Sequence, residues 1–196
     1  MVTYSVCRRI RKRITSIMSV AGLYTKDYFE NHGGSNYGEY IDWPFFKERA
    51  EWIVKTYKPK SVLEIGAAKG FMLKHLKDLG VKVSGYDISE YASGESGGLV
   101  KSWDVTKGVM DFTQYDLVVS FDFLEHIEDN DLAILLVSLK TARNQFHMIT
   151  TDEYDFHGDS THCSMYPKQW WLDKFDDSSI KNYTIIHAGE QEEFMV

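Results

Sequence analysis

The sequence predicts a doubly wound α/β domain built on a mostly parallel β-sheet. Between residues 61 and 150, short apolar runs alternate with segments whose apolar residues recur at helical spacing, as in parallel strands joined by helices. The runs are apolar along their whole length, which is typical of strands covered on both faces. With 196 residues, the chain suits one such domain and leaves little room for a second.

The expected elements follow in a regular order. A helix begins at Pro44, a residue suited to a first helical turn, and ends near Pro59. Strands are predicted at residues 61–65, 81–86, 99–103, 115–121 and 146–150, with helices at 70–79 and 129–142. A glycine-rich passage shortens the connection between the second and third strands. After a polar loop, a short helix is expected at 167–175, and residues 183–188 and 192–196 are expected to pair as an antiparallel hairpin around Gly189.

Residues 1–23 are predicted to form a separate basic amphipathic segment, and residues 24–196 the single domain. Residues 8–13 hold five arginines and lysines, and residues 1–23 contain no acidic residue. The favoured interpretation is a solvated helix that packs on the domain; a peripheral contact with a membrane or polyanion and a targeting peptide stay open. The tyrosine- and glycine-rich residues 24–40 are interpreted as a functional loop.

Composition narrows the function classes. No apolar run approaches the roughly 20 residues that span a bilayer, so no transmembrane segment is expected. A net charge of −7 argues against general nucleic-acid binding, and nucleic acid is not the expected partner. Two cysteines, Cys7 and Cys163, give neither a disulfide framework nor a cysteine metal site, which fits a reducing cytoplasm. The oligomeric state is left open.

The central chemical signal is a strand that breaks into glycines where a helix begins. After the apolar run, Gly66 and Gly70 bracket the turn, and glycine lets a backbone approach a ligand closely. The unpaired N–H groups of the new helix suit an anionic ligand group. About 20 residues later Asp87 ends the second strand, where a carboxylate can accept from both ribose hydroxyls. Asp104 after the third strand could accept from an adenine amino group, with Val105 against the ring.

Three segments carry a family resemblance: Leu63-Glu64-Ile65-Gly66-Ala67-Ala68-Lys69-Gly70, Gly85-Tyr86-Asp87-Ile88-Ser89 and the stretch from Val118 to Ile127. They resemble class I S-adenosylmethionine (SAM)-dependent methyltransferases, over about residues 24–171. The resemblance implies a Rossmann-like, seven-stranded sheet in the order 3-2-1-4-5-7-6, with SAM as cofactor and S-adenosylhomocysteine (SAH) as product. One departure is Ala68, where the family often has glycine.

The resemblance also implies residue roles. The methionine part of the cofactor would be held by the turn and the fourth strand, the ribose by the second strand, and the adenine after the third strand. A lid formed by the tyrosine-rich loop would close over it. The implied cofactor-binding residues are Tyr28, Tyr37, Glu64, Gly66, Ala67, Ala68, Lys69, Gly70, Asp87, Ile88, Asp104, Val105, Phe121 and Asp122.

The sequence lacks the motifs of two other classes of nucleotide-binding protein. The Gly-x-Gly-x-x-Gly of nicotinamide dehydrogenases is absent, because the spacing here is Gly66-x-x-x-Gly70. A P-loop is absent as well, since no Gly-Lys-Ser/Thr follows at the required distance. An ordinary tight turn would explain the two glycines alone, but it leaves the aligned carboxylates Asp87, Asp104 and Asp122 unexplained.

The expected reaction is an in-line methyl transfer to a hydroxyl, which calls for an aligned acceptor and a general base. The candidate catalytic residues are His126, His162 and Asp122, which follow strands four and five at the carboxyl edge of the sheet. Histidine accepts protons near neutrality. For His126 a structural role at the start of a helix is the favoured alternative, whereas His162 is evenly balanced between the two roles.

The acceptor is expected to be a sugar or another small molecule. The passage from 158 to 162 and Trp170-Trp171, like the tyrosine-rich opening, resemble a subset (types 11 and 12) associated with sugar and polysaccharide methylation. Both tryptophans could instead belong to a helix core. Asp122, Asp159 and His162 could gather a divalent cation, but a metal is not the expected cofactor. The alternatives are an RNA or protein methyltransferase docking through residues 8–13, and a noncatalytic SAM-binding module.

Overall fold

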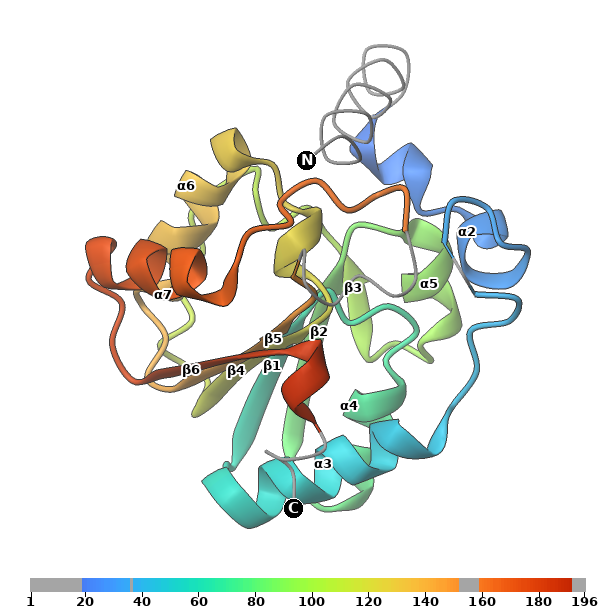
Figure 1. The fold of residues 1–196 in the computed structure, drawn as a ribbon. Helices are drawn as coiled ribbons and strands as arrows, with labels where there is room; N and C mark the ends of the chain where they lie inside the picture. Colours follow the sequence, from blue (N-terminus) through green and yellow to red (C-terminus); the bar gives the residue numbers. More distant parts are fainter. Residues whose placement is uncertain (1–18, 36, 152–158, 192–196) are drawn as a thin grey trace.

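The computed structural model describes residues 19–35, 37–151 and 159–191, and Figure 1 shows a single sheet with helices on both faces. The six described strands run parallel in the order β3-β2-β1-β4-β5-β6. Because β1 has β2 on one side and β4 on the other, the strand order reverses between β1 and β4. Ligands of such sheets bind outside the carboxyl ends of the strands at this reversal.

The strands are β1 (Ser61–Ile65), β2 (Lys82–Asp87), β3 (Val100–Ser102), β4 (Leu117–Phe121), β5 (Gln145–Ile149) and β6 (Tyr183–His187). The α-helices are α2 (Lys26–Glu30), α3 (Pro44–Tyr57), α4 (Phe71–Asp78), α5 (Glu90–Glu95), α6 (Asp129–Leu139) and α7 (Lys168–Asp177). Short 3-10 helices are η1 (Val20–Leu23), η2 (Leu124–His126) and η3 (Ala188–Glu190). The predicted alternation from residue 61 to 150 is confirmed, and the bounds of β1 agree with the prediction.

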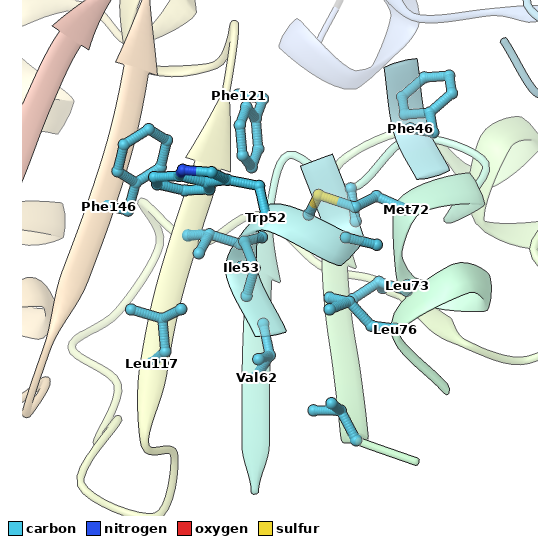
Figure 2. Close-up of a cluster of buried hydrophobic side chains, with 14 of the residues drawn as sticks. Phe46, Trp52, Ile53, Val62, Met72, Leu73, Leu76, Leu117, Phe121 and Phe146 are labelled. Atoms are coloured by element: carbon cyan, nitrogen blue, oxygen red, sulfur yellow. The ribbon is translucent and has the colours of Figure 1, made fainter. Parts of the chain in front are cut away.

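Each face of the sheet has its own apolar core, because successive strand residues point to opposite faces. Val62 of β1 packs in the core under α3 and α4, where Trp52 and Ile53 cover β4 and β5 (Figure 2). Its neighbour Leu63 packs in the other core under α6 and α7, with the fully buried Trp171. Two covered faces explain why the strands are apolar throughout.

The seventh strand and the C-terminal hairpin are not confirmed. Strand β6 lies parallel to β5, and Gly189 belongs to η3 instead of a hairpin turn. Polar contacts fix η3: the Glu190 carboxylate accepts from the His187 backbone N–H and from Lys168 Nζ of α7, the latter at 2.7 Å. Residues 192–196, the proposed second strand of the hairpin, lie outside the described residues.

Residues 1–18 also lie outside the described part of the chain, so the basic segment and its division from the domain stay predictions. Within the described ranges, no helix combines the length and apolar character needed to cross a bilayer.

Candidate functional site

A pocket opens at the carboxyl ends of β1, β2 and β4, where the strand order reverses. Four groups of residues line it: strand ends, the turn after β1, the loop after β3, and the aromatic segment before α3. The lining includes Tyr24, Tyr28, Tyr37, Tyr40, Trp43, Arg49, Glu64, Gly66, Ala68, Asp87, Ile88, Trp103, Asp104, Val105, Phe121, Asp122, His126, Glu128 and Asp131.

The turn after β1 brings backbone to the pocket wall. Gly66 has φ 73°, and a Cβ there would lie 2.4 Å from the ring of Phe123, so no other residue fits. Ala68 also adopts a left-handed conformation, with φ 47°. Its N–H donates to Asp87 Oδ2 at 2.8 Å, which ties the turn to the end of β2.

Asp87 is held from both sides. Its Oδ1 accepts from the Ser89 backbone N–H at 2.8 Å, while Oδ2 accepts from Ala68. Burial raises the pKa of Asp87, and these two N–H donors partly offset that effect. Each carboxylate oxygen has more than one lone pair, so the oxygens that orient the side chain can also accept from a ligand.

Glu64 is a buried carboxyl group in the pocket wall, 6% exposed at the end of β1. Its Oε2 has no hydrogen-bond partner among the described residues. Burial raises the pKa of Glu64 to about 8; Arg49 opposes this rise and Asp87 adds to it. An unpaired buried acceptor of this kind is costly, which points to a cationic donor supplied by a ligand.

Arg49, a residue that the sequence analysis missed, enters the pocket from α3. Its guanidinium lies 4.6 Å from the ring centroids of both Phe45 and Phe121, and its Nη2 lies 3.6 Å from Asp122 Oδ2. Asp122 has φ 51°, a strained conformation for a residue other than glycine, and also accepts from Thr150 Oγ1 at 3.2 Å. Arg49 therefore holds a half-buried carboxylate at the end of β4 in a fixed direction.

The loop after β3 forms the far end of the pocket. Asp104 Oδ1 accepts from the backbone N–H and the hydroxyl of Thr106, at 2.9 and 2.6 Å. Val105 is 4% exposed and lines the pocket with Ile88, while Trp103 is 51% exposed beside them. This end can enclose a flat apolar group.

The segment before α3 covers the pocket with aromatic rings. Within α2, Tyr28 donates a 2.6 Å hydrogen bond to Asp159 Oδ2. Glu30 is tied to Tyr91 of α5 by a hydrogen bond and to Lys69 Nζ by a 2.9 Å ion pair. These partners lower the pKa of Glu30 to about 2, with the Tyr91 hydrogen bond as the largest cause. Figure 1 shows α2 beside α5, so the covering segment is fastened to the domain by side-chain contacts.

A chain of hydrogen bonds leads from this cover to His126. Thr161 Oγ1 donates to Asp159 Oδ1 at 2.6 Å and lies 2.9 Å from His126 Nδ1. Because the single hydroxyl hydrogen is used on Asp159, the Thr161 oxygen accepts from Nδ1–H, which leaves the basic lone pair of neutral His126 on Nε2. Burial raises the pKa of Asp159. The positive charge of His126, when that ring is protonated, and hydrogen bonds from Thr161 and Tyr28 outweigh burial and lower the pKa of Asp159 overall.

The second predicted histidine lies behind the first. His162 is 8% exposed, and its ring centroid is 4.7 Å from that of His126, with the rings nearly edge to face. His126 lines the pocket and His162 does not.

Most predicted site residues meet around this one pocket. Tyr28, Tyr37, Glu64, Gly66, Ala68, Asp87, Ile88, Asp104, Val105, Phe121, Asp122 and His126 all line it. Ala67, Lys69, Gly70 and His162 do not. Arg49 lies on a helix that precedes every motif, and no motif signal marked it.

Trp170 and Trp171 belong to the α7 core and not to the pocket. Trp171 is fully buried under the sheet, and Trp170 stacks on Tyr166 with ring centroids 3.8 Å apart. The alternative that both tryptophans belong to a helix core is therefore confirmed, and they are not available to contact an acceptor in the pocket. The aromatic faces of the pocket come instead from Tyr24, Tyr37, Tyr40, Trp43 and Trp103.

Residues 43–176 match the family model described as a methyltransferase domain. No curated protein sequence matches the chain. Among solved structures, the chain is similar to a SAM-dependent methyltransferase from Archaeoglobus fulgidus, with 27% identity over 51% of this chain and 48% of that one, at a TM-score of 0.42.

Two further solved structures show the range of the match. The methyltransferase domain of bacterial CtHen1-CN is 15% identical over 68% of this chain and 83% of that one, with a TM-score of 0.54. Magnesium protoporphyrin IX methyltransferase from Synechocystis PCC 6803, solved with bound SAM, is 22% identical over 50% of this chain and 53% of that one, with a TM-score of 0.41. This chain spans about half the length of the first structures it matches.

Proposed function

Since this chain belongs to the methyltransferase domain family, we propose that it transfers a methyl group from SAM to the hydroxyl of a small, uncharged acceptor. The observation that carries the proposal is the pair of carboxyl groups at adjacent strand ends. Glu64 presents an unpaired buried oxygen to the pocket, and Asp87 presents a carboxylate fixed by two backbone N–H groups.

The polar and apolar groups of the pocket wall match the ammonium, ribose and adenine groups of SAM. Glu64 Oε2 would accept from the ammonium of the methionine part, which supplies the cation that the buried oxygen needs. Asp87 would accept from the ribose hydroxyls. Asp104 and Val105 would hold the adenine by its amino group and its face, while Gly66 and Ala68 allow the backbone to come close.

The reaction expected here is an in-line displacement. The acceptor oxygen forms a bond to the methyl carbon while the carbon–sulfur bond breaks, so the positive sulfonium becomes the neutral thioether of SAH. The acceptor hydroxyl must also lose its proton. His126 Nε2 is the base that we propose for this step, since Thr161 and Asp159 hold the ring in the tautomer with its lone pair there.

The charge of the pocket favours an uncharged acceptor. The lining carries six carboxyl groups, of Glu64, Asp87, Asp104, Asp122, Glu128 and Asp131, and one guanidinium, of Arg49, which already faces Asp122. Such a wall repels phosphate and carboxylate groups. The aromatic cover, formed by residues such as Tyr24 and Trp43, can stack on the C–H face of a sugar, so sugars are the first acceptors to test.

Isothermal titration with SAM and SAH tests the cofactor. We expect micromolar binding to the purified chain and a loss of at least about tenfold, or 1.4 kcal/mol, in Asp87→Asn. Asp116→Asn is the matched control, because Asp116 Oδ2 accepts from the Lys60 and Ser61 backbone N–H groups at the opposite end of β1 and away from the pocket. If folded wild-type protein binds neither ligand, the proposal is overturned.

A further inference from the structure

Three potential metal ligands lie close together behind the part of the pocket wall formed by Asp122 and His126, where the acceptor is expected to bind. We call this part the acceptor end of the pocket. Glu125 and His126 lie on η2, and His162 follows β5; one ligand atom from each lies within 4.8 Å of the other two. The two segments are locked together, since the backbone N–H groups of Cys163 and Ser164 both donate to the Glu125 carbonyl at 2.9 Å. The relative positions of the three side chains are therefore set by backbone contacts.

Glu125 is a buried carboxyl group with an unsatisfied oxygen. It is 0% exposed; Oε1 accepts from the Thr150 backbone N–H at 3.0 Å, and Oε2 has no hydrogen-bond partner within the described ranges. A cation beside Glu125 would satisfy this buried oxygen.

The surroundings of His126 are those of a metal ligand. Metal-bound histidines usually donate their second ring N–H to an oxygen that is itself held by other groups. His126 Nδ1–H donates to Thr161, which donates to Asp159, which in turn accepts from Tyr28. Three connected side chains beyond His126 therefore fix the direction of the Nε2 lone pair.

We propose that Glu125, His126 and His162 bind one first-row divalent transition-metal ion at the acceptor end of the pocket. Two imidazoles and one carboxylate favour Zn²⁺, Co²⁺ or Mn²⁺ over the all-oxygen preference of Mg²⁺ and Ca²⁺. Asp122 and Asp159, which the sequence left open as possible cation ligands together with His162, are instead paired with Arg49 and with Tyr28 and Thr161.

When the ion is bound, His126 is a metal ligand and no longer the general base; this use of the site in catalysis rests on the proposed function. An ion and a proton compete for the same Nε2 lone pair, so an ion-bound His126 cannot be the base. Three protein ligands leave a coordination position open, and His126 borders the pocket, so the acceptor hydroxyl would bind there. The ion would lower the pKa of that hydroxyl, its proton would pass to water, and the oxygen would then attack the methyl carbon.

Titration of tag-free protein with Co²⁺ tests the site, because visible d–d bands report nitrogen and oxygen ligation independently of activity. We expect one Co²⁺ per chain, displaced by Zn²⁺ and not by Mg²⁺. Glu125→Gln and His162→Asn should each weaken binding by more than the roughly 10- to 100-fold that loss of an outer partner costs, and Thr161→Val should fall within that range. His75→Gln is the matched control, since His75 pairs with Asp42 away from the cluster.

Two outcomes overturn the proposal: wild-type protein that binds none of these ions, or Co²⁺ spectra and affinities unchanged in both Glu125→Gln and His162→Asn. Thermal melting of each variant shows whether it folds, and Glu125→Gln keeps the acceptor for the Thr150 N–H. SAH titration of the same samples separates the two proposals. If the protein binds SAH but not Co²⁺, the metal-site proposal is wrong and the proposed methyltransferase function is unaffected. If it binds Co²⁺ but not SAH, the proposed function is wrong and the metal site stands.

Discussion

Ala68 occupies a backbone conformation that suits glycine better. Its φ of 47° brings Cβ close to the following carbonyl, which costs about 1–2 kcal/mol. We expect Ala68→Gly to raise the free energy of unfolding by about 1 kcal/mol, after the greater chain entropy of glycine is taken into account. SAH affinity should stay within a few-fold, because the N–H bonded to Asp87 is retained. Urea unfolding and calorimetric titration measure the two quantities.

Ala67 supplies the control for that substitution. It is 5% exposed, its φ is not positive, and its Cβ fills the space beside Gly85. Ala67→Gly should therefore lower the free energy of unfolding by about 1 kcal/mol. A stabilising Ala67→Gly or a destabilising Ala68→Gly would contradict this account of the turn.

Glu64 should couple cofactor binding to pH. In the ligand-free protein its pKa is about 8, so at pH 6 to 7.5 the group is mostly protonated. An ammonium needs the carboxylate, so binding releases a proton and affinity for SAH should rise with pH, by up to about tenfold per unit. The rise should level off near pH 8, because above that pH Glu64 is already ionised in the ligand-free protein.

Calorimetry at several pH values measures this dependence, and Glu64→Gln should abolish most of it. Glu64→Gln should also bind SAH more weakly at pH 7.5, because the amide cannot form the ion pair. A wild-type affinity that stays constant from pH 6 to 7.5 would show that Glu64 does not meet the ammonium.

Strand-end residues were predictable from the sequence, and residues that act through side-chain geometry were not. Glu64, Asp87 and Asp122 lie at or directly after apolar strands, so chain position alone places them at one edge of the sheet. Arg49 is one charged residue among several on an amphipathic helix, and its burial depends on the packing of α3 against β4. The hydrogen bond between Thr161 and His126 joins the loop after β5 to η2, and the two residues are 35 positions apart in the sequence.

The partly buried ion pair between Lys69 and Glu30 should help to hold helix α2 in position. Lys69 is 9% exposed, bonds Glu30 at 2.9 Å and lies over the Tyr91 ring. We expect Lys69→Met to speed hydrogen exchange of the α2 amides by roughly tenfold or more, since a hydrogen bond to a charged group contributes about 1.5–3 kcal/mol. SAH affinity should fall in parallel, because Tyr28 of α2 lines the pocket.

Lys26→Met is the matched control for Lys69→Met. Lys26 also faces Glu30, at 3.6 Å, but its side chain is 65% exposed, and such surface pairs contribute little. Equal effects of the two substitutions on α2 exchange would contradict a specific role for Lys69.

Strands that are buried on both faces were predicted more accurately than the segment around β6 at the edge of the sheet. Strand β1 is buried on both sides, so its apolar pattern fixes its bounds. At the other extreme, nothing in the apolar pattern around Gly189 distinguishes a hairpin turn from a 3-10 helix. The polar contacts of Glu190 with Lys168 and His187 decide that outcome, and they come from a different helix and from the end of β6.

The fold buries His147, Glu64 and Glu125 in surroundings that favour their neutral forms, so its free energy of unfolding should depend on pH. Burial lowers the pKa of His147 to about 3, while it raises that of Glu64 to about 8 and that of Glu125 well above its usual range. His147 therefore contributes stability that is present above its unfolded value of about 6.5 and lost as pH falls toward 3. The two glutamates contribute stability that is present below about 4.5 and lost as pH rises, through about 8 for Glu64.

With respect to these three groups, the ligand-free protein should accordingly be most stable near pH 4.5. Above that pH each buried glutamate removes up to about 1.4 kcal/mol of stability per pH unit, and between about pH 4.5 and 6.5 the gain from His147 offsets only one of the two losses. Urea unfolding at pH 6 and pH 8 measures the loss of unfolding free energy between these two pH values. Glu64→Gln should reduce this loss by the part that Glu64 contributes. Saturating SAH should have a similar effect in the wild type, because its ammonium stabilises the Glu64 carboxylate in the folded state only. Equal losses in wild type, Glu64→Gln and the SAH complex would mean that Glu64 is already ionised in the ligand-free fold, and the coupling between cofactor and stability would then have to come from another group.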